Sequence, residues 1–269
     1  MTKTILITGA GGGLGAALAK GFSDEGYQVY AGVREVSVDY NASGNIIPLE
    51  LDTTNPTHVV DAVKKIEQSG CGLTALINNA GIYAGGPIEC VPEANVRRVF
   101  EVNFFGTLAV TQAFLPLFRQ QKTGRILLIS SLSGLVALPC DGIYAASKHA
   151  LEAIAESLFV ELGRWNIDVQ LVEPGAFESG LTDQRDCLDA GPYRGMTKSD
   201  EQKLSLPSTE EMAEEIIHLL ERPVHSLRHP IGDQARSVFS QLGLDSQTKR
   251  QQFISDVSGS GEWAKNGDG

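Results

Sequence analysis

The sequence has few residues suited to a disulfide framework or a metal site. Its 269 residues include four cysteines, which are widely separated and form no Cys-x-x-Cys pair. Such a pattern is typical of reduced thiols in a cytosol. Among the five histidines, His225 and His229 flank a proline-containing loop, and the sequence suggests no third ligand nearby. We therefore expect no bound metal.

Basic residues are also scarce, with 22 Lys and Arg against 33 Asp and Glu, a formal net charge of −11 and a pI near 4.9. Nucleic-acid binding depends on clustered Lys and Arg side chains that neutralise phosphates. The charge balance therefore argues against a nucleic acid as partner.

No apolar run reaches the length that a membrane-spanning helix needs. The opening residues MTKTILITGAGG lead directly into a strand-like segment and then into glycines. They lack the long apolar region and the cleavage site of a secretory signal peptide. We therefore expect a cytoplasmic protein without membrane insertion.

No linker rich in Pro, Gly and Ser divides the chain, and strand-like and helix-like segments alternate from residue 3 to about residue 230. We expect one domain over residues 1–269. Weak periodicity and mixed polar, Gly and Pro content predict a substrate lid at about 180–206. The segment at about 246–269 is polar and predicts a fraying tail.

Short β-branched or apolar segments alternate with segments of helical spacing. The expected strands are 4–8, 27–33, 45–51, 73–80, 124–130 and 167–173, and the expected helices are 14–26, 56–70, 93–121, 142–164 and about 208–222. This alternation predicts an α/β fold, a Rossmann-like doubly wound parallel sheet. Ligands bind such sheets beyond the carboxyl ends of the strands, where the strand order reverses.

The segment TGAGGGLG, residues 8–15, follows the first strand and opens the first helix. Glycines let the backbone approach a pyrophosphate closely, and a helix N-terminus presents free N–H groups to it. The predicted cofactor-binding residues of this turn are Gly9, Gly11, Gly12, Gly13, Leu14 and Gly15. The alternative is a glycine-rich turn that binds nothing.

The second strand ends in Gly32-Val33-Arg34. An acidic residue at this point binds the ribose hydroxyls of NAD, whereas an arginine accepts the 2′-phosphate of NADP. Arg34 therefore favours NADP(H). Glu35 could repel that phosphate, so NAD(H) is the alternative.

The stretch DGIYAASKHA, residues 141–150, places Tyr144 four residues before Lys148 at the start of a predicted helix. Positions i and i+4 share a helix face, so the phenol and the ammonium are expected side by side. Asp141 is expected to cap this helix. Taken alone, the stretch is more readily explained as a capped helix that carries two solvated side chains.

The order of several motifs along the chain indicates that the stretch at 141–150 is part of an active site. TGAGGGLG, NNAG at 78–81, Ser131, YAASK at 144–148 and EPGAFES at 173–179 follow one another along the chain. This order resembles the short-chain dehydrogenase/reductase family over roughly residues 3–180. The segments VYAGVRE and SGLVALPCDGIYAASK also resemble its steroid and retinol dehydrogenase branch.

The resemblance assigns four catalytic residues. It makes Tyr144 the general acid/base and gives Lys148 two tasks, to stabilise the phenolate and to hold the nicotinamide ribose. A phenol titrates near pH 10 in water, so proton transfer near neutrality requires that stabilisation. Ser131 matches the serine that hydrogen-bonds the substrate oxygen, and Asn103 matches an asparagine of a water-linked proton path. Read alone, Asn103 is a polar residue that interrupts a helix.

The resemblance also assigns the remaining cofactor contacts. Asn79, Ala80 and Gly81 lie near the adenosine ribose, and Asp52 matches an aspartate that contacts adenine. The positions expected near the nicotinamide, besides Tyr144 and Lys148, are Pro174, Gly175, Ala176, Phe177 and Ser179, of which Ser179 replaces the usual threonine.

These residues imply hydride transfer between a nicotinamide and a small-molecule carbonyl or secondary alcohol. The candidate pocket is mostly apolar, which suggests a hydrophobic substrate; it comprises Tyr83, Leu135, Val136, Cys140, Ile143, Phe177 and 181–193. The alternatives are an NADP-binding regulator without turnover and an epimerase or dehydratase. The family pattern and the small residues of 144–164 imply a homodimer or homotetramer that pairs helices 103–121 and 144–164.

Overall fold

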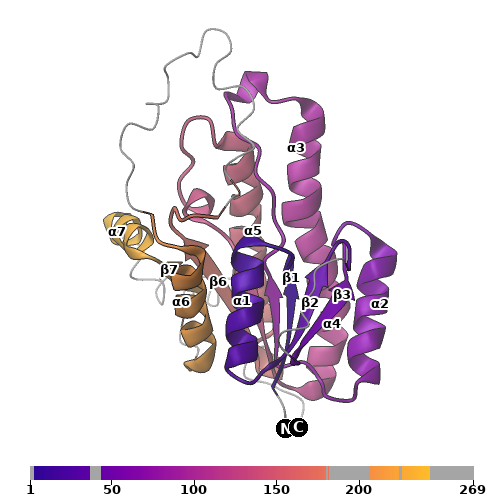
Figure 1. The fold of residues 1–269 in the computed structure, drawn as a ribbon. Helices are drawn as coiled ribbons and strands as arrows, with labels where there is room; N and C mark the ends of the chain where they lie inside the picture. The colour runs from indigo at the N-terminus through magenta and orange to yellow at the C-terminus, as the bar shows by residue number, and fades with distance from the viewer. Residues whose placement is uncertain (1–2, 37–43, 180, 182–205, 224–225, 243–269) are drawn as a thin grey trace.

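The described residues form one seven-stranded parallel sheet in the computed structural model shown in Figure 1. These residues are 3–36, 44–179, 181, 206–223 and 226–242. The strands are β1 (Thr4–Thr8), β2 (Gln28–Val33), β3 (Ile46–Glu50), β4 (Ala75–Asn78), β5 (Gly124–Ile129), β6 (Ile167–Pro174) and β7 (Arg228–Ile231). Their order is β3-β2-β1-β4-β5-β6-β7. The order reverses between β1 and β4, which puts the expected ligand crevice at their carboxyl ends.

Helices cover both faces of the sheet (Figure 1). The α-helices are α1 (Gly13–Asp24), α2 (Pro56–Gln68), α3 (Glu93–Phe100), α4 (Thr107–Gln121), α5 (Gly142–Glu161), α6 (Thr209–Glu221) and α7 (Asp233–Gln241). A π-helical segment, η2 (Glu101–Gly106), joins α3 to α4, and short 3₁₀ turns are η1 (Ile88–Cys90), η3 (Leu132–Gly134) and η4 (Gly163–Trp165). In the part of the chain that is described, no helix is both long and apolar enough to cross a bilayer.

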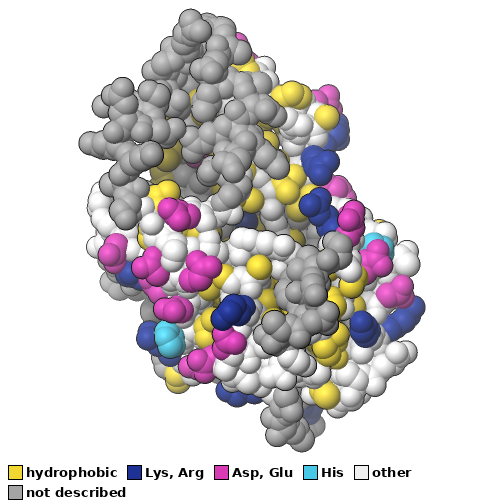
Figure 2. Space-filling view, in the orientation of Figure 1, with side chains coloured by type: hydrophobic (Ala, Val, Ile, Leu, Met, Phe, Trp, Pro, Cys, Tyr) yellow, Lys and Arg dark blue, Asp and Glu magenta, His cyan; other side chains and the backbone are white. Residues whose placement is uncertain are grey.

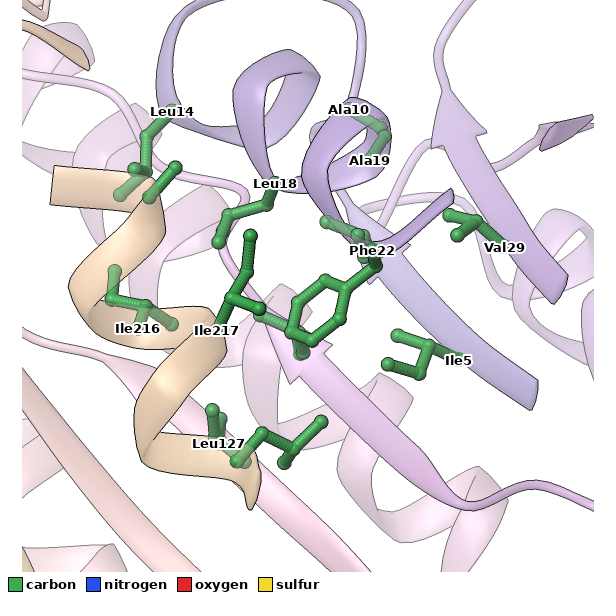
Figure 3. Close-up of a cluster of buried hydrophobic side chains, with 14 of the residues drawn as sticks. Ile5, Ala10, Leu14, Leu18, Ala19, Phe22, Val29, Leu127, Ile216 and Ile217 are labelled. Carbon is green, nitrogen blue, oxygen red and sulfur yellow. The ribbon is translucent and has the colours of Figure 1, made fainter. Parts of the chain in front are cut away.

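The core has two halves because successive side chains of a strand point to opposite faces. In β1, Ile5 and Ile7 pack under α1 and α6, while Leu6 packs on the opposite side with residues of α2 and α4. Figure 3 shows Phe22 of α1 beside Ile217 of α6. Both faces of the sheet are therefore buried, which explains why its strands are continuous apolar runs.

The predicted doubly wound sheet is confirmed, and the six predicted strands and five predicted helical segments match observed elements within a few residues. Two features differ. The predicted helix at 93–121 contains the π-helical segment η2, and the sequence analysis did not include β7 and α7. The predicted lid, except for Leu181 and Leu206, and the predicted tail lie outside the described residues.

Candidate active site

A cleft of about 1860 Å³ opens beyond the carboxyl ends of the strands. All the predicted cofactor-binding residues and three of the predicted catalytic residues, Ser131, Tyr144 and Lys148, line its wall. Asn103 is fully buried behind that wall. The fold thus brings the first motif, at residues 8–15, and the last, at residues 173–179, to the same cleft.

The turn after β1 depends on glycine at specific points. Gly9 has a φ of +66°, and a Cβ there would lie 2.8 Å from the Ala80 Cα. A Cβ at Gly15 would collide with the Gly9 carbonyl oxygen. At Gly12, by contrast, a Cβ would meet no protein atom within 4 Å, and no side chain caps α1. The open backbone and uncapped helix N-terminus fit the pyrophosphate of a dinucleotide.

Asn79 ties this turn to the end of β4. Its side-chain amide donates to the carbonyl oxygens of Thr8 at 3.0 Å and Gly9 at 3.2 Å. The Thr8 hydroxyl accepts the backbone N–H groups of Asn79 and Ala80, both at 3.0 Å. The segment after β4 therefore has a structural task, which is to brace the glycine turn against the neighbouring strand.

Arg34 and Asp52 follow β2 and β3 and line one end of the cleft. Burial raises the pKa of Asp52, but hydrogen bonds from Thr54, together with the nearby Arg34 guanidinium, help to outweigh it, so the pKa lies below its ordinary value. The Thr54 hydroxyl donates to the Asp52 carboxylate at 2.7 Å. Asp52 is therefore an ionised group that Thr54 holds in a fixed position.

Tyr144 lies in the first turn of α5 and is almost fully buried. Burial is the main cause that raises the pKa of its phenol to about 12; a hydrogen bond with Ser131 opposes this shift, and the charge of Asp141 adds to it. Near neutral pH the phenol therefore keeps its proton, which suits an acid that donates to a substrate oxygen.

Lys148 lies one turn further along the same face of α5. Its Nζ is 5.7 Å from the centre of the Tyr144 ring and donates to the carbonyl oxygen of Ile129 at 2.8 Å. Burial lowers the pKa of Lys148 to about 8, and the charge of Glu152 opposes that shift. The ammonium expected beside the phenol is present, but it titrates close to the neutral range.

Ser131 follows β5 and begins the short turn η3. Its hydroxyl accepts the N–H of Ser133 at 3.1 Å and shares a hydrogen bond with Tyr144. Two hydroxyl groups thus converge on one point of the cleft, where they could bind the same carbonyl oxygen.

Asn103 lies in the π-helical segment η2, and both the nitrogen and the oxygen of its side-chain amide form hydrogen bonds. It donates to the carbonyl oxygen of Ile82 at 2.9 Å and to the Ser147 hydroxyl at 3.0 Å, and it accepts the N–H of Ile82 at 2.8 Å. A Cβ added at Gly81 would lie 3.5 Å from the Asn103 Oδ1 and 3.7 Å from the Lys148 Nζ. Asn103 therefore fixes the backbone next to Lys148 from outside the cleft.

Asp141 occupies the N-cap position of α5 as expected, but the expected capping by its side chain is wrong. Its side chain makes no capping hydrogen bond and instead accepts the hydroxyl of Tyr83. The ring of Tyr83 lies 5.1 Å, centre to centre, from that of Tyr144. Sequence reasoning placed Tyr83 only in the substrate pocket, because nothing local to either residue indicates a contact between segments so far apart.

The other end of the cleft follows β6. The N–H of Gly175 donates to Ile231 at 3.0 Å, the N–H of Ala176 donates to the Gln234 side chain at 2.7 Å, and the Ser179 hydroxyl accepts the N–H of Leu181 at 3.2 Å. Elements β7 and α7, absent from the sequence analysis, therefore brace the loop after Pro174.

The apolar wall is only partly the one expected. Tyr83, Phe177 and Leu181 line the cleft, and so do Leu206, from the end of the predicted lid, and Leu138, which was not predicted. Four residues that were expected in the pocket do not line the cleft, although the structure describes them: Leu135, Val136, Cys140 and Ile143. Within the described part of the chain, no group of three or more His, Cys, Asp or Glu residues is placed to hold a metal ion.

Comparison with known proteins finds relatives with named activities. A family model described as short chain dehydrogenase matches residues 3–187. The 3-ketodihydrosphingosine reductase of Bacteroides thetaiotaomicron is 39% identical over 183 residues, which cover 68% of this chain and 67% of the relative. Estradiol 17-beta-dehydrogenase 2 of Mus musculus is 37% identical over 70% of this chain and 51% of its own length. The match therefore spans only about half of that longer relative.

Solved structures share the fold. A short-chain dehydrogenase from Streptomyces avermitilis superposes with a TM-score of 0.81 at 27% identity, covering 96% of this chain and 97% of the other. A short chain dehydrogenase from Burkholderia cenocepacia, in complex with NADP, has a TM-score of 0.75 at 27% identity, covering 93% and 97%. With the matched family model and the named relatives, these likenesses show that the chain belongs to the short chain dehydrogenase family.

Proposed function

We propose that this protein is an NADPH-dependent reductase that converts a hydrophobic ketone to a secondary alcohol. The observation that carries the proposal is the state of Tyr144. Its phenol faces the cleft, is hydrogen-bonded to Ser131, and has a pKa of about 12. A phenol with so high a pKa is protonated near neutral pH and so holds the proton that carbonyl reduction requires, whereas alcohol oxidation would first require its ionisation.

Each catalytic residue has one task in the reduction. Ser131 donates a hydrogen bond to the carbonyl oxygen, and Tyr144 transfers its proton to that oxygen as negative charge develops. Lys148, buried beside the ring, stabilises the phenolate that remains. Asn103 keeps the adjoining backbone in place. The bound nicotinamide would supply the hydride for the carbonyl carbon.

The choice of NADPH is supported by Arg34, which lies at the end of β2 and lines the cleft. A guanidinium there can pair with a 2′-phosphate. The related dehydrogenase from Burkholderia cenocepacia is also described in complex with NADP. Glu35 and the ionised Asp52 line the same end and oppose a second negative charge, which keeps NADH as the alternative.

Specificity constants for NADPH and NADH test this choice. We expect NADPH to be preferred, and Arg34→Leu to lower kcat/KM for NADPH by about tenfold to a hundredfold while leaving NADH little changed. Lys64→Leu, an exposed site on α2 paired with Asp61, is the matched control. A clear preference of the unmodified protein for NADH would reject the NADPH assignment.

The substrate class is supported by the apolar cleft wall, which includes Tyr83, Leu138, Phe177 and Leu206. Relatives are named for 3-ketodihydrosphingosine, estradiol and retinol, which are all lipophilic compounds. Apolar side chains around a few convergent hydroxyls are typical of a site for such ligands. A panel of ketones of increasing hydrophobicity, followed by NADPH absorbance, would identify the class.

Tyr144→Phe tests the reaction itself. The change removes one oxygen atom from a buried ring, so the fold and NADPH binding should persist while ketone reduction falls by about 10²- to 10⁴-fold. Binding without turnover in the unmodified protein would favour the regulatory alternative. Turnover of substrate without stoichiometric loss of NADPH would favour an epimerase or a dehydratase.

A further inference from the structure

A cluster of charged side chains is buried behind the catalytic residues, and the reaction does not use it directly. Glu152 comes from α5, Glu173 from β6 and Arg228 from β7, with side-chain exposures of 7%, 0% and 6%. Buried charges are costly to desolvate, and an apolar cluster of the same volume is often as stable. The cluster therefore calls for an explanation beyond packing.

Glu152 is at the centre of the cluster. One carboxylate oxygen accepts the Ser130 hydroxyl at 2.5 Å, and the other accepts the Nε of Arg228 at 2.9 Å. Arg228 also donates to Glu156 at 2.9 Å and lies 3.6 Å from Glu173. A guanidinium thus locks the Glu152 carboxylate in one orientation.

Burial raises the pKa of both Glu152 and Glu173. The two groups differ in their partners. Glu152 accepts a direct hydrogen bond on each oxygen, whereas one oxygen of Glu173 accepts none. We therefore assign the negative charge to Glu152 and a proton to Glu173, since Arg228 stabilises the group it contacts more closely.

The cluster is connected to three parts of the active site. Glu152 follows Lys148 by one helical turn, and its charge favours the protonated lysine against burial. Ser130 directly precedes Ser131, and Glu173 directly precedes Pro174. One ionised side chain is thus linked, through its partners, to the catalytic serine and to the loop after β6.

We propose that Glu152 is a positioning residue that keeps Lys148 charged and holds the Ser131 strand end in place for proton transfer. This inference rests on the proposed reductase function. The titratable and charged groups that face Glu152 are Lys148 and Glu156 on its own helix, Glu173 on β6 and Arg228 on β7. Of these, only Lys148 lines the cleft.

Glu152→Gln tests the proposal, because it keeps the shape of the side chain and removes its charge. Lys148 should then lose its proton at lower pH. The alkaline limb of the profile of kcat against pH should move down by about one pH unit. Glu156→Gln is the matched control, since it removes a carboxylate that also pairs with Arg228 but should leave the limb in place.

A second readout needs neither cofactor nor turnover. The difference in unfolding free energy between the protein and its Lys148→Met variant depends on pH around the pKa of Lys148. Measured again in the Glu152→Gln background, the midpoint of that dependence should move down by about half a pH unit, because only the native pKa of Lys148 falls and the unfolded pKa stays the same. If Glu152→Gln does not fold, Glu152→Gln combined with Arg228→Gln leaves no lone buried charge between them and gives the same readouts.

Two outcomes distinguish a failure of the positioning role of Glu152 from a failure of the proposed reductase function. If Glu152→Gln lowers stability but moves neither the kinetic limb nor the unfolding midpoint, Glu152 is structural and the inference is wrong. If the midpoint moves although the unmodified protein reduces no ketone, the link between Glu152 and Lys148 holds and the proposed reductase function fails.

Discussion

At the scale of single residues, the two central groups of the site are held away from their ordinary ionisation. Burial raises the pKa of Tyr144 to about 12 and lowers that of Lys148 to about 8, so burial favours the neutral form of each. Near neutral pH the phenol is neutral in the folded and the unfolded chain alike, so its raised pKa costs no stability. Lys148 must be charged in a buried site, so function and stability oppose each other at Lys148.

Lys148→Met should make the protein more stable as well as inactive. Below about pH 8 the native lysine must be charged in a buried site, whereas in the unfolded chain it is charged at no cost up to about pH 10.5. Removing it should raise the free energy of unfolding near neutral pH by about 1–2 kcal/mol, after allowing for the lost hydrogen bond to Ile129. Urea unfolding of the unmodified protein and the variant measures this difference in the free energy of unfolding.

The size of this stabilisation also depends on pH. Between the native and unfolded pKa values the unfolded chain binds more protons, so the stability of the unmodified protein rises with pH. The advantage of Lys148→Met should therefore shrink as the pH passes about 8 and approaches 10.5. An advantage that stayed constant over this range would contradict the buried charge.

Asp141→Asn should shift the reverse reaction. The Asp141 charge raises the pKa of Tyr144, so its removal should make the phenolate easier to form. Alcohol oxidation should then begin at a pH lower by about half a unit to one unit. Tyr83→Phe, which loses the hydrogen bond to Asp141 but keeps the aromatic contact, separates the charge from the packing.

The placement of site residues was predictable where it depends on local spacing. The spacing of Tyr144 and Lys148 is a helix property, and their shared face follows from it. The contacts of Asp141 with Tyr83 and of Glu152 with Arg228 join distant segments. No local pattern carries that information, so they required the structure.

At the scale of elements, the glycine turn offers a matched pair of variants. Gly15→Ala would force a methyl group onto the Gly9 carbonyl and should cost about 2–3 kcal/mol of stability. Gly12→Ala meets no protein atom within 4 Å and has an extended φ of −177°, so stability should not fall. If the pyrophosphate binds there, NADPH affinity should nevertheless weaken. Thermal unfolding and NADPH fluorescence measure the two effects.

The elements that sequence reasoning missed have physical explanations. The β7 strand RHPI has only four residues at the sheet edge and carries a proline, so it shows neither an apolar run nor alternation. The π-helical segment at Glu101–Gly106 differs from an α-helix in its hydrogen-bond pattern, which apolar spacing does not report. The buried strands, by contrast, were evident because both their faces are covered.

At the scale of the whole molecule, acidic side chains gather over α6 and its surroundings (Figure 2). This helix carries Glu210, Glu211, Glu214, Glu215 and Glu221. A negative face opposes association with polyanions. The distribution therefore supports the inference from net charge that a nucleic acid is not the partner.

The predicted homo-oligomer can be tested on the helices expected to form it. Ala146 and Ala153 are exposed on α5, and Phe105, which precedes α4, is 52% exposed. Small exposed residues allow two helices to approach closely, and burial of an exposed aromatic ring at an interface is favourable.

We expect light scattering to report a dimer or a tetramer, and Ala153→Glu to reduce the measured mass toward that of the monomer. Val60→Asp, which replaces a residue of α2 that is 49% exposed, should leave the mass unchanged. A monomer in the unmodified protein would overturn the prediction while leaving the active-site assignments untouched, because their residues come from one chain.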